Sequence, residues 1–102
     1  MTDKKEEFRK RVYCFTLDII RLVDTTKKDM SCAVICKQLI RSGTSVGANH
    51  SEAQAASSRK DFINFLHYSL KSANETVFWL SILRDSDKVS EEYVNKIIKE
   101  AK

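Results

Sequence analysis

The chain contains no proline and only two glycines, Gly43 and Gly47, in 102 residues. Proline and glycine are the residues that most often form tight turns, so a fold with many turns would normally use more of both. Hydrophobic residues make up 42% of the chain and charged residues 31%, which is typical of a globular protein rather than a disordered one. The sequence therefore predicts one all-helical domain with short connections.

Apolar residues recur at steps of three and four along most of the chain, which is the spacing of a helix with one buried face. The pattern predicts helices at about residues 6–24, 31–55, 59–84 and 90–101, after a polar tail at residues 1–5. Short connections place successive helices antiparallel, so the predicted fold is all-α. We expect an up-down-up-down four-helix bundle over residues 1–102, with a short fourth helix.

Side chains suited to cap helices precede three of these segments. Asp29 or Ser31 is expected to cap the second helix, Ser58 the third and Ser90 the fourth. These caps place the starts of the three helices.

The expected core follows the apolar seams of the long helices. In the first helix the predicted buried residues are Phe8, Val12, Phe15, Ile19 and Leu22. In the third they are Phe62, Leu66, Ala73, Val77, Leu80 and Leu83.

Two sets of apolar residues lie outside these seams at about 100° per residue. Tyr13, Leu17 and Ile20 form a second ridge on the first helix. Phe78 and Ile82 fall in the polar sector of the third. Scattered apolar residues are normal on a protein surface, but a contiguous ridge favours contact with another subunit. We therefore predict that these five residues form an oligomer interface.

The two glycines are four residues apart on the second helix. Glycine costs about 1 kcal/mol of helix propensity relative to alanine. We expect this cost to be compensated by the close approach of a neighbouring helix, which the absence of a side chain allows.

The stretch Arg41 to Leu83 contains R-S-G-T-S-V-G-A-N-H-S-E, then S-R-K-D-F, then A-N-E-T-V-F-W-L. This pattern resembles that of the four-helix bundle proteins of the 23S rRNA intervening-sequence family. These are similar to the accessory variability proteins of diversity-generating retroelements. The matching motif positions are Arg41, Ser42, Asn49, Glu52, Lys60, Asp61, Phe62, Glu75, Trp79 and Leu80.

The resemblance implies a bacterial four-helix bundle that assembles as a homopentamer. It also implies no known enzymatic activity and a role as an accessory protein that binds nucleic acid or a partner protein. In the retroelement relatives that partner is a reverse transcriptase.

The formal net charge of +4 is compatible with a nucleic-acid partner, although many proteins without one carry as much. A ring would repeat each basic patch, and phosphate affinity rises steeply with the number of contacts. The alternative is a protein-interaction scaffold, for example for a nucleic-acid enzyme, without direct nucleic-acid binding. The candidate nucleic-acid-binding residues are Arg9, Lys10, Arg11, Lys37, Arg41, Arg59 and Lys60.

The remaining reactive residues do not form a recognisable catalytic or metal-binding motif. Cys32 and Cys36 are one helical turn apart, and His50 is too far along the same helix to join them. Glu52 and Glu75 are expected to pair with Arg41 or Lys71, or to cap side chains, rather than act as a catalytic pair. We predict no cofactor, no metal site and no enzymatic activity. The charged N-terminus and the lack of a long apolar run predict a cytoplasmic location without membrane contact.

Overall fold

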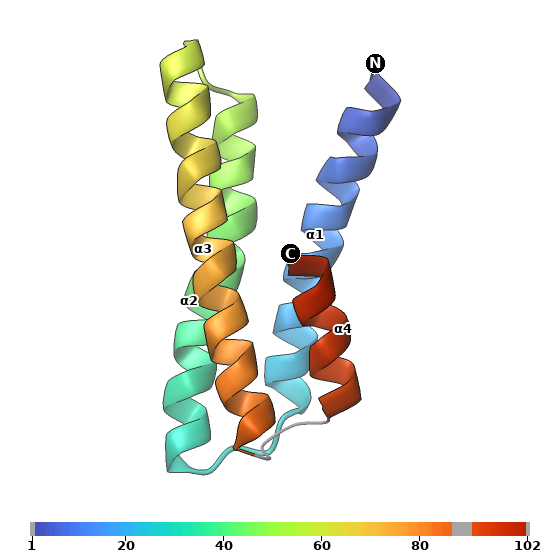
Figure 1. Cartoon of the computed structure of the whole chain (residues 1–102), viewed down its shortest axis with the longest axis vertical. Helices are drawn as coiled ribbons and strands as arrows, with labels where there is room; N and C mark the ends of the chain where they lie inside the picture. Colours follow the sequence, from blue (N-terminus) through green and yellow to red (C-terminus); the bar gives the residue numbers. More distant parts are fainter. Residues whose placement is uncertain (1, 87–90, 102) are drawn as a thin grey trace.

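A computed structural model describes residues 2–86 and 91–101 of the chain. It contains four helices: α1 (Thr2–Thr25), α2 (Met30–Gln54), α3 (Arg59–Asp85) and α4 (Glu91–Ala101). Successive helices run antiparallel, and α4 ends near the middle of the bundle while the other three continue (Figure 1). The all-α four-helix bundle with a short fourth helix is therefore confirmed.

The helices occupy the corners of a square. Packed pairs are α1 with α2, α2 with α3, α3 with α4, and α1 with α4. No Cα atom in the described part of α1 lies within 8 Å of one in α3, and the same holds for α2 and α4. These are the diagonals of the square. At about 1.5 Å per residue, the 27 residues of α3 extend about 40 Å and the 11 of α4 about 16 Å. The fourth corner is thus filled over less than half its length.

The observed helix ends agree with the capping predictions that fall on described residues. Asp29 accepts a hydrogen bond from the backbone N–H of Cys32 at 2.9 Å, and Ser58 accepts one from Asp61 at 3.1 Å. The predicted Ser90 cap lies outside the described residues. The predicted polar tail was wrong, because α1 already begins at Thr2. Residues 2–7 are rich in lysine and acidic residues, which suit a helical first turn but carry no apolar period to reveal it.

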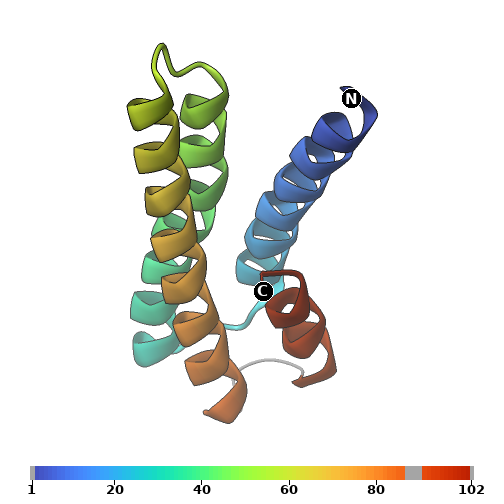
Figure 2. The same ribbon diagram turned by 45° about the horizontal axis from the view of Figure 1, so that its top comes forward.

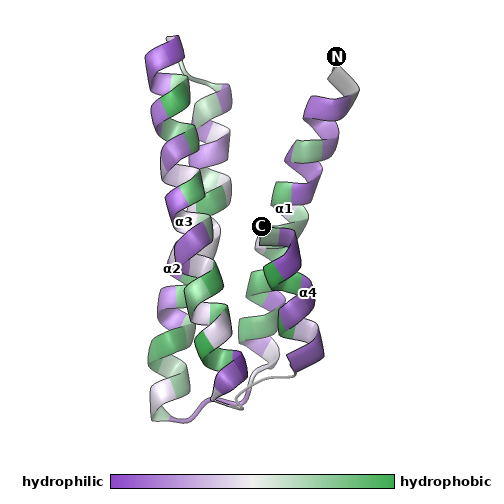
Figure 3. Cartoon of the chain, viewed as in Figure 1, coloured by the Kyte–Doolittle hydropathy of each residue, from purple (hydrophilic) through white to green (hydrophobic). Residues whose placement is uncertain are grey.

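The core is concentrated at the end of the bundle where α4 packs. The largest fully buried apolar side chains there are Ile19, Leu39, Leu80, Leu83 and Val94. Toward the other end α1 leans away from the α2–α3 pair, as both ribbon views show (Figures 1 and 2). Hydrophobic residues continue along α3 and α1 in that half (Figure 3).

Three residues predicted for the core are consequently exposed. Phe8 is 51% exposed, Phe62 36% and Leu66 37%. Their spacing places them on the inner faces of α1 and α3, as predicted, but α4 does not reach far enough to cover them. Burial was therefore predicted wrongly for these three.

Both helical glycines face α1. A Cβ atom on Gly43 would lie 2.9 Å from Cγ2 of the buried Ile19, and one on Gly47 would lie 3.1 Å from Oγ1 of Thr16. The expected close helix approach is thus present, with α1 as the neighbour. None of the described helices combines the length and hydrophobicity needed to cross a membrane.

Candidate nucleic-acid interface

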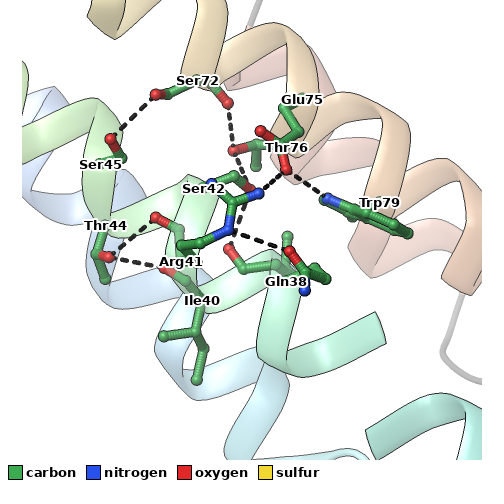
Figure 4. Close-up of polar contacts among 11 residues, drawn as sticks. Gln38, Ile40, Arg41, Ser42, Thr44, Ser45, Ser72, Glu75, Thr76 and Trp79 are labelled. Carbon is green, nitrogen blue, oxygen red and sulfur yellow. Dashed lines mark hydrogen bonds and ion pairs between the residues drawn. The ribbon is translucent and has the colours of Figure 1, made fainter. Parts of the chain in front are cut away.

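Small hydroxyl side chains join α2 and α3 along their contact. Thr76 donates a hydrogen bond to the Ser42 hydroxyl at 3.0 Å, and Ser69 donates one to the Val46 carbonyl at 2.9 Å. The Ser45 and Ser72 hydroxyl oxygens are 3.1 Å apart (Figure 4). Small residues let the backbones of α2 and α3 approach closely. As a result, the solvent-facing side chains of the two helices on either side of this contact form one continuous surface, called the α2–α3 surface below.

Arg41, Glu75 and Trp79 form a polar cluster on that surface (Figure 4). The Arg41 guanidinium pairs with Oε2 of Glu75, which also accepts a hydrogen bond from Nε1 of Trp79 at 2.9 Å. A further hydrogen bond of 3.1 Å joins Arg41 Nε to Gln38. The expected pairing of Glu75 with Arg41 is therefore present. It compensates the Glu75 carboxylate while the Arg41 side chain remains 59% exposed.

A polar hollow of about 360 Å³ lies beside this cluster, between α2 and α3. Asn49 Nδ2 donates to the backbone carbonyl of Ser45 at 2.9 Å and to its hydroxyl at 3.0 Å. The hollow is lined by Ser45, Asn49, Tyr68, Lys71, Ser72 and Glu75.

The surface that contains this hollow is poor in negative charge. Neither residues 30–51 nor residues 62–74 contain an aspartate or glutamate. The side chains of Lys37 and Lys71 form no ion pair or hydrogen bond with any residue that the structure describes. Both ammonium groups are therefore available to an anionic ligand.

The other predicted basic residues lie on two separate helices, α1 and α3, toward the end of the bundle where α1 begins. Arg9 and Lys10 are exposed on α1, and Arg59 and Lys60 are exposed at the start of α3, at the same end of the molecule (Figure 1). Arg11 instead donates to Glu100 of α4 at 2.8 Å. The structure thus places the candidate cations in three sets: one on α1, one at the start of α3, and the pair Lys37 and Arg41 on α2.

Among the predicted interface residues, Tyr13, Phe78 and Ile82 are exposed in the protomer, whereas Leu17 and Ile20 are partly buried. Tyr13, Leu17 and Ile20 line a hollow of about 710 Å³ between α1 and α2, and Tyr13 is 68% exposed. Phe78 is 54% exposed and packs edge-on against Trp79, with 4.9 Å between ring centroids. Ile82 is 37% exposed. These positions lie outside the core, as the sequence predicted, and their role at an interface stays a prediction.

A third hollow, of about 400 Å³, occupies the part of the fourth corner that α4 leaves open. Phe8, Val12, Leu66 and Leu70 line it, and Ala101 of α4 borders it on the side of the buried core. Most of its lining is apolar, although Arg11, His50, Ser69 and Glu100 also border it, and it is distinct from the polar hollow between α2 and α3.

Two of the three cysteines, Cys32 and Cys36, and the buried histidine lie in the interior of the bundle, whereas Cys14 is exposed. Cys32 and Cys36 are buried with their sulfur atoms 3.8 Å apart, and burial together with the Cys32 contact raises the pKa of Cys36 to about 11. His50 packs against the Phe8 ring at 5.1 Å, and burial followed by repulsion from Arg9 lowers its pKa below 6.5. Within residues 2–86 and 91–101 no group of three or more histidine, cysteine or acidic side chains is placed to hold a metal ion.

Sequence reasoning missed Tyr68, Lys71 and the hydroxyl groups beside them. The spacing of Tyr68, Lys71 and Glu75 at steps of three and four places them on one side of α3, so a signal was present. Polar residues at helical spacing are common on surfaces, however, and only the pairing with α2 identifies a shared hollow.

Comparison with known proteins assigns the family. Residues 4–102 match the family described as 23S rRNA-intervening sequence protein. A protein with unknown function from the S23 ribosomal protein family of Bacteroides thetaiotaomicron VPI-5482 has a similar crystal structure, with a TM-score of 0.80 and 37% sequence identity. The match covers 91% of this chain and 86% of that one. No curated protein matches the chain.

Proposed function

Because this chain belongs to the 23S rRNA-intervening sequence protein family, we propose that it is a homo-oligomeric scaffold that binds the backbone of RNA or DNA. The proposal involves no catalytic step. The observation that carries it is the α2–α3 surface. There the side chains of Lys37 on α2 and Lys71 on α3 form no ion pair with a described residue, and each lies in a stretch of its helix, residues 30–51 and 62–74, that contains no acidic residue.

Exposed apolar surface supports the oligomer. The Tyr13, Leu17 and Ile20 ridge borders a hollow between α1 and α2, whereas Phe78 and Ile82 project from α3. The two sets lie on different faces of the protomer. Contact between them would join unlike faces, which generates a ring when the rotation closes. The number of five subunits is an expectation from the family resemblance.

Repetition around a ring would strengthen nucleic-acid binding. Each cation that neutralises a phosphate releases a counterion, so affinity falls steeply with salt as the number of contacts grows. The side chains available for such contacts are mostly lysines and arginines without a base-reading element. We therefore expect binding with little sequence preference.

The test is fluorescence anisotropy of labelled RNA and DNA over a salt series. We expect measurable binding at low salt that weakens steeply with added salt. Lys37→Glu should weaken it and reduce the slope of log affinity against log salt by about one for each phosphate that is no longer neutralised. Lys96→Glu on α4 is the matched control and should leave binding unchanged. Equal binding by the wild-type protein and Lys37→Glu would remove this patch from the proposal.

A second candidate is a protein-interaction scaffold, possible partners being a reverse transcriptase or another nucleic-acid enzyme. The apolar hollow beside Phe8, Leu66 and Leu70 favours it, because this surface suits a protein better than a polyanion. Absence of any RNA or DNA binding at low salt, with capture of such an enzyme that survives nuclease treatment, would support this candidate over the first.

A further inference from the structure

We propose that the polar hollow between α2 and α3 holds one nucleotide of single-stranded RNA, with its base on Tyr68 and a phosphate at Lys71. The inference rests on the proposed nucleic-acid binding and specifies its ligand. The two residues are three apart on α3 and line the same hollow of about 360 Å³.

Tyr68 offers an aromatic surface to a base. Its side chain is 52% exposed, and its contact with Phe65 is edge-on, with 75° between the rings and 6.3 Å between centroids. Among the described residues no ring stacks in parallel on it. A base that is not paired in a duplex can stack on such a ring, and every base has a suitable face.

Lys71 and Ser45 supply donors for a phosphate. The Lys71 ammonium forms no ion pair with a described residue. The Ser45 hydroxyl oxygen already accepts hydrogen bonds from Ser72 at 3.1 Å and from Asn49 at 3.0 Å. Its own O–H group can therefore donate to a ligand in the hollow.

The Glu75 carboxylate at the margin of the hollow repels an anionic ligand less than an unpaired carboxylate would. It is paired with Arg41 and accepts a hydrogen bond from Trp79 at 2.9 Å. The cluster thus compensates the one acidic group that lines the hollow.

The neutral polar groups favour RNA over DNA. Asn49 uses its Nδ2 group within the protein, while its Oδ1 atom accepts no hydrogen bond from a described residue. A ribose 2′-hydroxyl can donate to such an oxygen, and deoxyribose lacks this group. A duplex would present neither an unstacked base nor a single strand narrow enough to enter.

The experiment compares three labelled ligands of one sequence: single-stranded RNA, single-stranded DNA and duplex RNA. We expect the order of affinity to be single-stranded RNA, then single-stranded DNA, then duplex. Tyr68→Leu should weaken single-stranded RNA binding roughly 5- to 100-fold because the base can no longer stack on a ring, whereas Tyr68→Phe should keep most of it. Tyr93→Leu, at an exposed tyrosine on α4, is the control and should change nothing.

Trp79 provides a second readout, since it is the single tryptophan and is hydrogen-bonded to a residue that lines the hollow. Its emission should change when unlabelled single-stranded RNA is added. Equal binding of the three ligands with no effect of Tyr68→Leu would overturn this site while leaving backbone binding intact. Single-stranded DNA bound as tightly as RNA would overturn the assignment to RNA. Absence of all binding would overturn both proposals.

Discussion

The two ends of this bundle are built from the same kind of helix and differ in what covers them. At the closed end, where α4 packs, Leu80 and Leu83 of α3 are completely buried. At the open end, beyond the last turn of α4, Leu66 and Leu70 of the same helix are 37% and 57% exposed. An apolar stripe therefore specifies which residues share a face. The length of the opposing helix decides which of these residues become buried from solvent.

The largest expected difference is between leucines at the two ends. Leu80→Ala should destabilise the fold by about 2–5 kcal/mol, because it removes buried contacts and leaves a cavity. Leu70→Ala should cost less than about 1 kcal/mol in the protomer, because more than half of that side chain is already exposed. Urea unfolding of both variants measures the free energies. Similar losses would mean that the open end is covered in solution.

Alanine substitutions at the two glycines compare how closely α1 packs on α2 at two positions, Gly43 nearer the closed end and Gly47 nearer the open end. Gly43→Ala should destabilise by about 1–2 kcal/mol, since the new methyl group meets Ile19 at 2.9 Å and a buried side chain has little room to move. Gly47→Ala should lie within about 1 kcal/mol of the wild type, because the gain in helix propensity offsets its 3.1 Å contact with the Thr16 hydroxyl. Thermal unfolding followed by circular dichroism compares them. A more harmful Gly47→Ala would contradict this ranking.

A smaller effect is expected at the cluster on α2 and α3. Glu75→Gln removes the charge that pairs with Arg41 but keeps an oxygen that can accept from Trp79. Because both charged side chains are partly exposed, the loss should be about 0.2–1 kcal/mol. Glu75→Ala should additionally shift the emission of Trp79, whose indole N–H loses its partner. An unchanged spectrum in Glu75→Ala would show that this hydrogen bond is not maintained in solution.

The smallest effect expected is the dependence of stability on pH that His50 causes at the open end. Burial, then Arg9, lowers the pKa of His50 in the folded protein below 6.5, so the unfolded chain takes up this proton first as pH falls. The His50 contribution to stability is therefore complete above about pH 6.5 and decreases below it. Urea midpoints at pH 7.5 and 5.5 should differ more for the wild type than for His50→Leu. An equal pH dependence in both proteins would contradict this assignment.

The sequence predicted the fold because its helical period is uninterrupted and its connections are short. It did not predict the lean of α1 or the exposure of Phe8 and Phe62, because periodicity carries no information on where an opposing helix ends. The Arg41 and Glu75 pair was expected. The hollow beside Tyr68 and Lys71 was not, since it depends on the exact pairing of α2 with α3.

The central proposal is that further copies of the chain bury two apolar sets, the Tyr13, Leu17 and Ile20 ridge and the Phe78 and Ile82 pair. Light scattering with size separation at high protein concentration measures the assembled mass directly. We expect the wild type to have a mass several times that of one chain. Phe78→Lys combined with Ile82→Lys should reduce that mass while leaving the helical circular dichroism unchanged. A wild-type protein that remains a single chain at high concentration would contradict the account.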